Sequence, residues 1–261
     1  MPDSLISEKY DRYLGPFLFE PFALDLVNRI AGKNYENVLE LACGTGRVTR
    51  HLRRVLPKAK IVATDSQSDM IRVASQQLPD NNIQWQTADA QQLTFADQSF
   101  NLIICQFGLM FMRDRSKVLA EIYRILKPGG KFIFNTWDKI ENNGAIYLGN
   151  QIICSYFPEH PPTNYRLPFT LHQPDLLETN LLATGFKNIK VGAVEKEGIS
   201  PSAKDAAIGI VEGNPVYNLI VQKDPNLVEV IRSAVEQKIA EAYGEHPLKT
   251  PLRAWVLEAQ K

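Results

Sequence analysis

Short apolar, β-branched runs alternate with segments of helical period through the first half of the chain. The run Phe100–Gln106 is apolar at nearly every position, which is typical of a strand buried on both faces. The same pattern predicts five strands, at Asn37–Ala42, Lys60–Thr64, Ile83–Thr87, Phe100–Gln106 and Lys131–Thr136. Alternation of strands and helices predicts an α/β fold with a doubly wound, mostly parallel sheet.

The intervening helices have recognisable ends. Asp114 is a candidate N-cap for a helix whose apolar residues repeat through Leu126. Lys127–Gly130 then ends that helix, because proline cannot continue it and glycine suits its C-terminal cap.

The pattern changes after Thr136. Residues 138–172 are rich in proline and aromatic side chains, and residues 200–247 are largely helical. The best helical segment is Pro225–Tyr243, with Asp224 as N-cap and one apolar stripe that we expect to pack on the domain. The remaining predicted elements are a helix at Pro174–Thr184, a strand at Lys187–Val194 and an antiparallel last strand at Arg253–Ala259. We therefore predict a single domain over residues 1–261, with its core at about 35–137, 174–194 and 248–261, and helical insertions at about 138–172 and 200–247 as a substrate lid.

Composition narrows the class of protein. Lys and Arg together number 29, as do Asp and Glu, and this neutral balance argues against binding to nucleic acid. The three cysteines form no CxxC pair, so neither a disulfide framework nor a metal site is predicted. The N-terminus lacks a signal-peptide pattern, and no apolar run approaches the roughly 18–20 residues of a membrane span. These features predict a cytoplasmic protein.

A glycine-rich turn lies within Val38–Leu52, between an apolar run and a helix. Such turns bring backbone N–H groups close to a ligand. A Walker loop requires lysine after its last glycine, but Arg47 follows Gly46, which excludes that loop. The dinucleotide fingerprint is met at Gly44 and Gly46, whereas Thr49 occupies its third glycine position. A nucleotide-dependent oxidoreductase therefore stays open as an alternative.

Tyr123 and Lys127 match the YxxxK pattern of short-chain dehydrogenases. The lysine, however, lies at a predicted helix end, and the TGxxxGxG turn that accompanies this pattern is absent. We interpret the match as chance.

Five motifs, in order and at matching spacing, resemble those of class I S-adenosylmethionine-dependent methyltransferases with a Rossmann-like fold. The chain is most similar to the small-molecule branch that includes the ubiquinone/menaquinone-biosynthesis methyltransferases. The motifs are Glu40–Gly46, Asp65 after the second strand, Ala88–Ala90 after the third, Phe100–Gln106, and Leu126–Gly130 before the fifth. The resemblance covers about residues 35–137. It implies S-adenosyl-L-methionine as cofactor and S-adenosyl-L-homocysteine as product.

The resemblance implies cofactor contacts for nine residues, namely Glu40, Ala42, Gly44, Gly46, Asp65, Met70, Asp89, Ala90 and Gln106. Asp65 would accept both ribose hydroxyls, Asp89 would receive the adenine amino group, and Met70 would pack on the adenine face. Gln106 would lie beside the transferable methyl group. Glu40 would repel a phosphate but suits a cationic ligand.

Each of these side chains also has a purely structural interpretation. In this alternative, Glu40 is a surface acid that caps a neighbouring helix, and Asp65 is the N-cap of the helix near Ser68. Likewise, Asp89 would stabilise its own Asx turn, and Met70 would be a residue of the hydrophobic core.

Methyl transfer from a sulfonium is an in-line displacement, so the protein mainly aligns the reactants, which can supply about 7–11 kcal/mol of the barrier. A phenol or carbon acid would also need a base, for which His160, His172 and Asp138 are the candidates. The alternative is that histidines in a proline-rich loop are exposed side chains with no role in catalysis.

The predicted function is methyl transfer to an oxygen, nitrogen or carbon atom of a small, partly apolar acceptor. Its candidate lining residues are Phe107, Phe111, Tyr147 and Tyr165. The alternatives are the oxidoreductase and a non-catalytic module that binds S-adenosylmethionine. The motifs specify neither the acceptor nor the oligomeric state.

Overall fold

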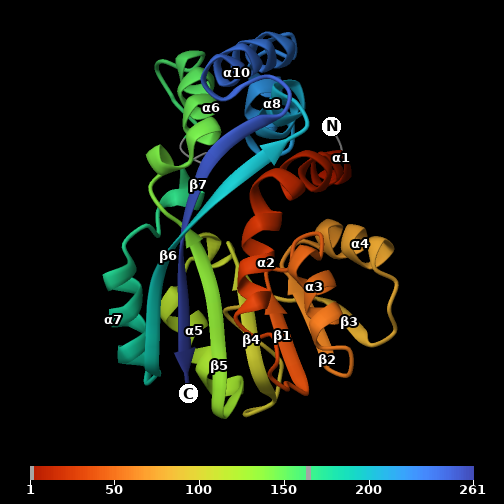
Figure 1. The fold of residues 1–261 in the computed structure, drawn as a ribbon, viewed down its shortest axis with the longest axis vertical. Coiled ribbons are helices and arrows are strands. Elements are labelled where there is room, and N and C mark those ends of the chain that lie inside the picture. The colour runs from red at the N-terminus through yellow and green to blue at the C-terminus, as the bar shows by residue number, and fades with distance from the viewer. Residues whose placement is uncertain (1–2, 163–165) are drawn as a thin grey trace. The chain divides into compact units, whose positions relative to one another are not determined.

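The computed structural model describes residues 3–162 and 166–261 (Figure 1). It divides into two compact units, each described by itself. The sheet unit comprises Phe22–Trp137, Leu171–Val194 and Ala254–Lys261. The helical unit comprises the N-terminal segment to Pro21, Asp138–Thr170 and Glu195–Arg253, and so contains most of the two predicted insertions.

The seven-stranded sheet has the order β3-β2-β1-β4-β5-β7-β6. Its strands are β1 (Asn37–Leu41), β2 (Lys60–Asp65), β3 (Ile83–Thr87), β4 (Phe100–Gln106), β5 (Leu126–Trp137), β6 (Lys187–Ser200) and β7 (Leu248–Gln260). The first five strands run parallel to one another, and β7 pairs antiparallel with β5. The predicted α/β class, with a mostly parallel sheet and an antiparallel C-terminal strand, is confirmed.

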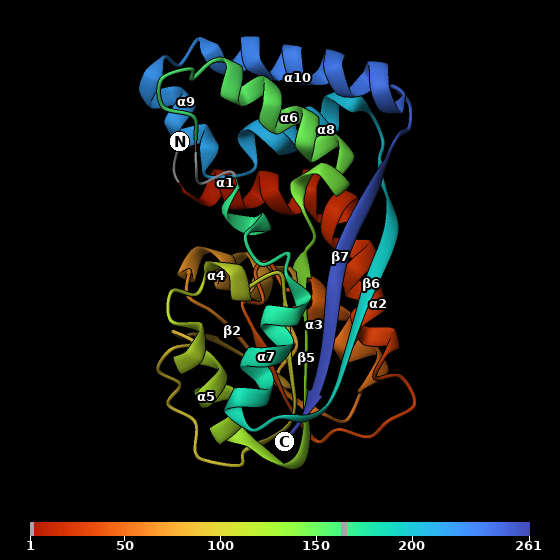
Figure 2. The ribbon, with the colours of Figure 1, turned by 90° about the vertical axis from the view of Figure 1, so that its left-hand side faces the viewer.

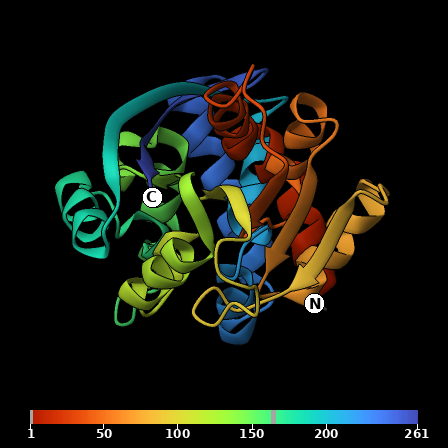
Figure 3. The same ribbon diagram turned by 90° about the horizontal axis from the view of Figure 1, so that it is seen from below.

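Helices cover both faces of the sheet within the sheet unit (Figures 1 and 3). These helices are α2 (Glu20–Asn28), α3 (Arg47–Val55), α4 (Ser68–Gln77), α5 (Arg115–Ile125) and α7 (Pro174–Thr184). A buried cluster joins α2 and α3 to one face of the sheet, including Leu26, Leu52 and Ile104. On the other face, Phe186 packs against Tyr123 of α5 at a ring-centroid distance of 5.2 Å. This double coverage explains why the central strands are apolar on both faces.

Local signals fix the helix ends. The Asp114 side chain accepts a hydrogen bond from the Lys117 N–H at 3.0 Å, which confirms the predicted N-cap of α5. The helix α7 has the predicted bounds, with Pro174 in its first turn and Gly185 as its left-handed C-cap at φ 107°.

The helical unit contains α1 (Asp3–Lys9), the π-type helix η1 (Tyr10–Phe19), α6 (Gly144–Ser155), α8 (Ala203–Glu212), α9 (Val216–Lys223), α10 (Leu227–Tyr243) and the short turns η3 (Ile140–Asn142) and η5 (Leu167–Phe169). The helix α10 packs on α6 and α8 through buried Ile231, Val235 and Ile239, as its stripe predicted (Figure 2). Buried Glu212 pairs with Lys9 and, at 2.9 Å, with Arg232, which ties α8 to α1 and α10.

Several predicted bounds were wrong. The helix α10 begins at Leu227 with Asn226 as N-cap, because the Asp224 side chain instead accepts the Asn226 N–H at 2.9 Å in an Asx turn. Strand β5 begins at Leu126 rather than Lys131, since a register shift between Phe100 and Leu102 of β4 accommodates the glycine turn. Strands β6 and β7 are longer than predicted, and α1, η1, α2 and α6 were not predicted.

Candidate cofactor and active site

The turn after β1 consists of residues in unusual backbone conformations. Ala42, Gly44 and Gly46 have φ values of 52°, 55° and 79°. A Cβ on Gly46 would lie 2.9 Å from the Trp85 ring, so glycine is required there for both space and conformation. A Cβ on Gly44 would meet no atom within 4 Å, so the backbone on that side of the turn is open to a ligand.

Asp65, the last residue of β2, holds this turn. Its Oδ2 accepts the Gly44 N–H at 2.9 Å, and its Oδ1 accepts the Gln67 N–H at 2.9 Å. Burial raises the pKa of Asp65, and the backbone hydrogen bonds from Gln67 and Gly44 oppose that rise. The N-cap of α4 is Gln67, so capping does not account for Asp65. Each carboxylate oxygen keeps a second acceptor site, which suits a pair of hydroxyl groups.

Glu40 is buried, with 1% of its surface exposed, so the surface-acid interpretation was wrong. Thr49 Oγ1 donates a hydrogen bond to Glu40 Oε2 at 2.5 Å. Burial raises the pKa of Glu40 to about 8, and the Thr49 hydrogen bond opposes the rise. Thr49 stands at the position where a dinucleotide fingerprint has its third glycine, and here its hydroxyl fixes the acidic residue of the turn.

The predicted adenine contacts lie after β2 and β3. Met70 is half-buried in α4, Asp89 is exposed and Ala90 is half-buried. Asp89 Oδ1 accepts the Gln91 N–H at 2.8 Å, which is the Asx-turn geometry considered above. The Gln91 side-chain amide also donates to both carboxylate oxygens of Asp89, at 3.3 Å each.

The end of β4 carries a second strained position. Phe107, directly after Gln106, has φ 48°, and its N–H reaches the Asn135 side-chain Oδ1 at 2.9 Å. The Phe107 ring stacks on Trp137 with centroids 3.8 Å apart and planes within 4°. Phe22 of α2 meets both rings edge-on, at 5.3 and 5.2 Å. These aromatic contacts build one rigid wall beside Gln106.

The other predicted acceptor and base residues come from both units. Phe111 is 55% exposed, Tyr147 is half-buried in α6, and Tyr165 lies outside the described residues. His172 is half-buried in the sheet unit. Asp138 Oδ2 accepts from Asn142 at 2.7 Å and pairs with Arg253 at 3.2 Å, which makes it a weak candidate base.

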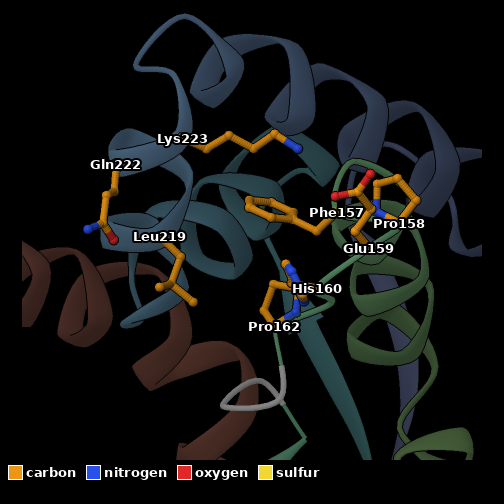
Figure 4. A pocket seen from close by; sticks show the side chains of 8 residues that line it. All are labelled: Phe157, Pro158, Glu159, His160, Pro162, Leu219, Gln222 and Lys223. Atoms are coloured by element: carbon orange, nitrogen blue, oxygen red, sulfur yellow. The ribbon is translucent and has the colours of Figure 1, made fainter.

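His160 lines a pocket of the helical unit, with a volume of about 530 Å³ (Figure 4). Its walls come from both predicted insertions: Phe157, Pro158, Glu159, His160, Pro162, Leu219, Gln222 and Lys223. The Lys223 ammonium lies 4.7 Å from the centre of the Phe157 ring and donates to the Tyr156 carbonyl at 2.6 Å. The lining thus combines the apolar Phe157 and Leu219 with the charged Glu159 and Lys223.

Sequence reasoning missed Asn135, Trp137 and Phe22. The available signal was the run Asn135–Trp137, because asparagine is unusual inside an otherwise apolar strand.

Within the described residues, no group of three or more His, Cys, Asp or Glu side chains is placed to hold a metal ion. None of the described helices combines the length and the apolar character needed to cross a bilayer.

The sheet order, the strained turn after β1 and the acidic residue ending β2 fit the fold of class I S-adenosylmethionine-dependent methyltransferases. Residues 39–134 match the family model described as a methyltransferase domain. This match confirms the resemblance found from the motifs.

Named relatives agree with this class. A ubiquinone/menaquinone biosynthesis C-methyltransferase of Desulfotalea psychrophila is 38% identical over 96 residues, covering 37% of this chain and 39% of the relative. A demethylmenaquinone methyltransferase of Thermotoga maritima is 38% identical over 131 residues, covering 49% and 56%. The chain thus spans about half or less of the length of these relatives.

Among solved structures, a phosphoethanolamine N-methyltransferase of Haemonchus contortus in complex with phosphomonomethylethanolamine and S-adenosylhomocysteine has a TM-score of 0.63. It is 19% identical, and the match covers 98% of this chain and 56% of that one. This likeness shows the fold alone.

Proposed function

We propose that the protein transfers a methyl group from S-adenosylmethionine to an oxygen, nitrogen or carbon atom of a small, partly apolar acceptor. The observation that carries this proposal is the Asp65 carboxylate, which is bound to the Gly44 N–H at 2.9 Å, where β1 and β2 end. Parallel sheets bind their ligands at this edge. A carboxylate there suits the paired hydroxyl groups of a ribose.

The residues present fit this cofactor. Asp65 would hold the ribose hydroxyls, Asp89 the adenine amino group and Met70 the adenine face. The open side of Gly44 leaves room for the methionine part, with Glu40 beneath the turn. When bound, S-adenosylmethionine supplies an activated methyl group on a sulfonium.

The chain's own residues mainly position the reactants. The Phe107 ring, stacked on Trp137, provides a fixed apolar wall that excludes water beside Gln106. A phenol or carbon acid would release a proton, for which His160 and His172 remain the proposed bases.

Two observations support a small, partly apolar acceptor. Relatives of this chain are named as quinone-biosynthesis C-methyltransferases. In this chain, the pocket of about 530 Å³ combines Phe157 and Leu219 with charged Glu159 and Lys223.

The oxidoreductase alternative is less well supported. Its fingerprint would need a glycine where Thr49 binds Glu40. The Tyr123 ring packs against Phe186 and lies 4.6 Å from the Lys261 ammonium, which gives it a structural role. A module that binds the cofactor without turnover would use the same residues.

Calorimetry with S-adenosylhomocysteine, S-adenosylmethionine and NADPH tests the proposal. We expect micromolar binding of the first two and loss of at least about tenfold in affinity for Asp65→Ala. Asp80→Ala is the matched control, because Asp80 also accepts a backbone N–H two residues on, at 2.8 Å from Asn82, but lies before β3 rather than after β2. Binding of NADPH alone would contradict the proposal. Turnover of an acceptor panel then separates the enzyme from a non-catalytic module.

A further inference from the structure

The segment that follows β3 is hydrogen-bonded to helix α5 at both ends of that helix. The Leu93 N–H donates to Glu121 Oε2 at 3.0 Å, and the Leu93 carbonyl accepts from the Arg124 guanidinium at 3.0 Å. At the start of the helix, the Asp114 N–H donates to Gln91 Oε1 at 3.0 Å. Gln91 thus lies in a segment whose position is fixed by α5.

The orientation of the Gln91 amide follows from this contact. Only an oxygen can accept the Asp114 N–H, so Oε1 faces α5 and Nε2 is left for Asp89. Nε2 donates to both carboxylate oxygens of Asp89 at 3.3 Å each, and the Gln91 N–H donates to Asp89 Oδ1 at 2.8 Å. Among the residues that the structure describes, all hydrogen bonds to the Asp89 side chain come from Gln91.

These contacts leave the Asp89 carboxylate with room for a ligand. A carboxylate has about four acceptor sites, two on each oxygen. Gln91 occupies both sites of Oδ1 and one site of Oδ2, so one site on Oδ2 remains. Asp89 is exposed, so a ligand can reach that site. Because Gln91 holds the carboxylate through its backbone and its side chain, the remaining site keeps a fixed direction.

The place of Asp89 in the sheet indicates which part of a ligand it meets. The segment with Asp89 follows β3, and β3 is the neighbour of β2, which ends at the proposed ribose contact Asp65. The base of a nucleoside lies next to its ribose. A carboxylate accepts hydrogen bonds and does not donate them, so it favours a base that presents an amino group.

We propose that Gln91 is a positioning residue, whose amide directs the remaining acceptor site of Asp89 toward the amino group of the adenine. This proposal rests on the proposed function and makes Gln91 a determinant of selectivity for a 6-aminopurine. The opposite role would be competition, with the Gln91 amide taking the place of the ligand amino group. The contact with Asp114 argues against competition, because rotation of the amide away from Asp89 would also break that hydrogen bond.

The test is a double-mutant cycle between Gln91 and Asp89, measured by calorimetry. The two probes are S-adenosylhomocysteine and its 6-deamino analogue, in which hydrogen replaces the amino group of the purine. Gln91→Met removes the amide at nearly constant length, and Asp89→Ala removes the acceptor. Gln84→Met is the matched control, because Gln84 Nε2 also donates at 3.3 Å, but to Gln86 within β3.

We expect the wild type and Gln84→Met to prefer S-adenosylhomocysteine over the deamino analogue by about tenfold, as for one hydrogen bond. Gln91→Met should reduce this preference to about threefold or less, through weaker binding of S-adenosylhomocysteine alone. In the Asp89→Ala background, Gln91→Met should change neither affinity, because no acceptor remains to be directed. A merely structural role of Gln91 would instead lower both affinities in both backgrounds.

A preference that survives in Gln91→Met would overturn the proposal, as would its loss in Gln84→Met. Tighter binding of S-adenosylhomocysteine to Gln91→Met would also overturn it, since that result indicates competition. A wild type that binds S-adenosylhomocysteine without preferring it to the deamino analogue contradicts this inference alone. If the wild type does not bind S-adenosylhomocysteine, the proposed function itself fails, and the two failures are thereby distinguished.

Discussion

Glu40 makes the stability of the protein depend on pH in an unusual direction. Its carboxyl group is buried, and its pKa is raised from 4.5 to about 8. The folded protein therefore keeps this proton up to about pH 8, whereas the unfolded chain loses it near pH 4.5. Unfolding releases a proton between these values, so the contribution of Glu40 lowers the free energy of unfolding as pH rises.

The size of the effect follows from the shift. A difference of about 3.5 pH units at 1.36 kcal/mol per unit gives about 5 kcal/mol across the window from pH 4.5 to 8. Glu40→Gln has no such proton and keeps an amide that Thr49 can contact. We expect the variant to be more stable than the wild type at pH 8, and the difference to shrink toward pH 5.

Urea unfolding of wild type and Glu40→Gln at pH 5, 6, 7 and 8 measures this difference directly. Glu121→Gln is the control, because Arg124 lowers the pKa of Glu121 and so keeps its titration below this range. A difference between wild type and Glu40→Gln that is constant across the four pH values, or that grows toward pH 5, would refute the reasoning.

Three further predictions use the same unfolding assay. Gly46→Ala should destabilise by about 1–3 kcal/mol, more than Gly44→Ala, because only the former places a Cβ 2.9 Å from Trp85; equal losses would contradict this. Glu212→Gln should cost about 2 kcal/mol by weakening its two ion pairs in the helical unit, and a neutral result would show that these pairs contribute nothing. Asp114→Ala should cost about 1 kcal/mol through the lost N-cap of α5, with Asp114→Ser as the variant that restores it.

The parallel core of the fold was predictable from sequence because its signals are local. The strands Ile83–Thr87 and Phe100–Gln106 and the helix Pro174–Thr184 have the bounds that their apolar runs, prolines and glycines indicate. The helices before β1 were missed, although Phe22, Ala23 and Leu26 repeat at helical spacing and are fully buried.

In the candidate site, too, the residues found from sequence belong to a local motif, and the residues missed depend on contacts between distant parts of the chain. The turn glycines and Asp65 were found because their spacing along the chain carries the motif. The contact between Asn135 and Phe107 joins residues 28 apart in the sequence and depends on the register of β4 and β5, which no local pattern specifies. The burial of Glu40 likewise depends on what covers the turn.

Destabilising features concentrate at the carboxyl ends of the central strands. Ala42 and Phe107 hold left-handed conformations that side chains disfavour, Glu40 is buried as an acid, and Asn135 keeps an unused donor among the described residues. Elsewhere in the sheet unit the same strands are packed with apolar side chains that carry no such penalty. A fold selected for stability alone would have glycine at residues 42 and 107 and apolar residues at 40 and 135. A ligand that ionises Glu40 would recover part of this free energy on binding, so we expect bound S-adenosylhomocysteine to raise the melting temperature of the wild type by more than that of Glu40→Gln.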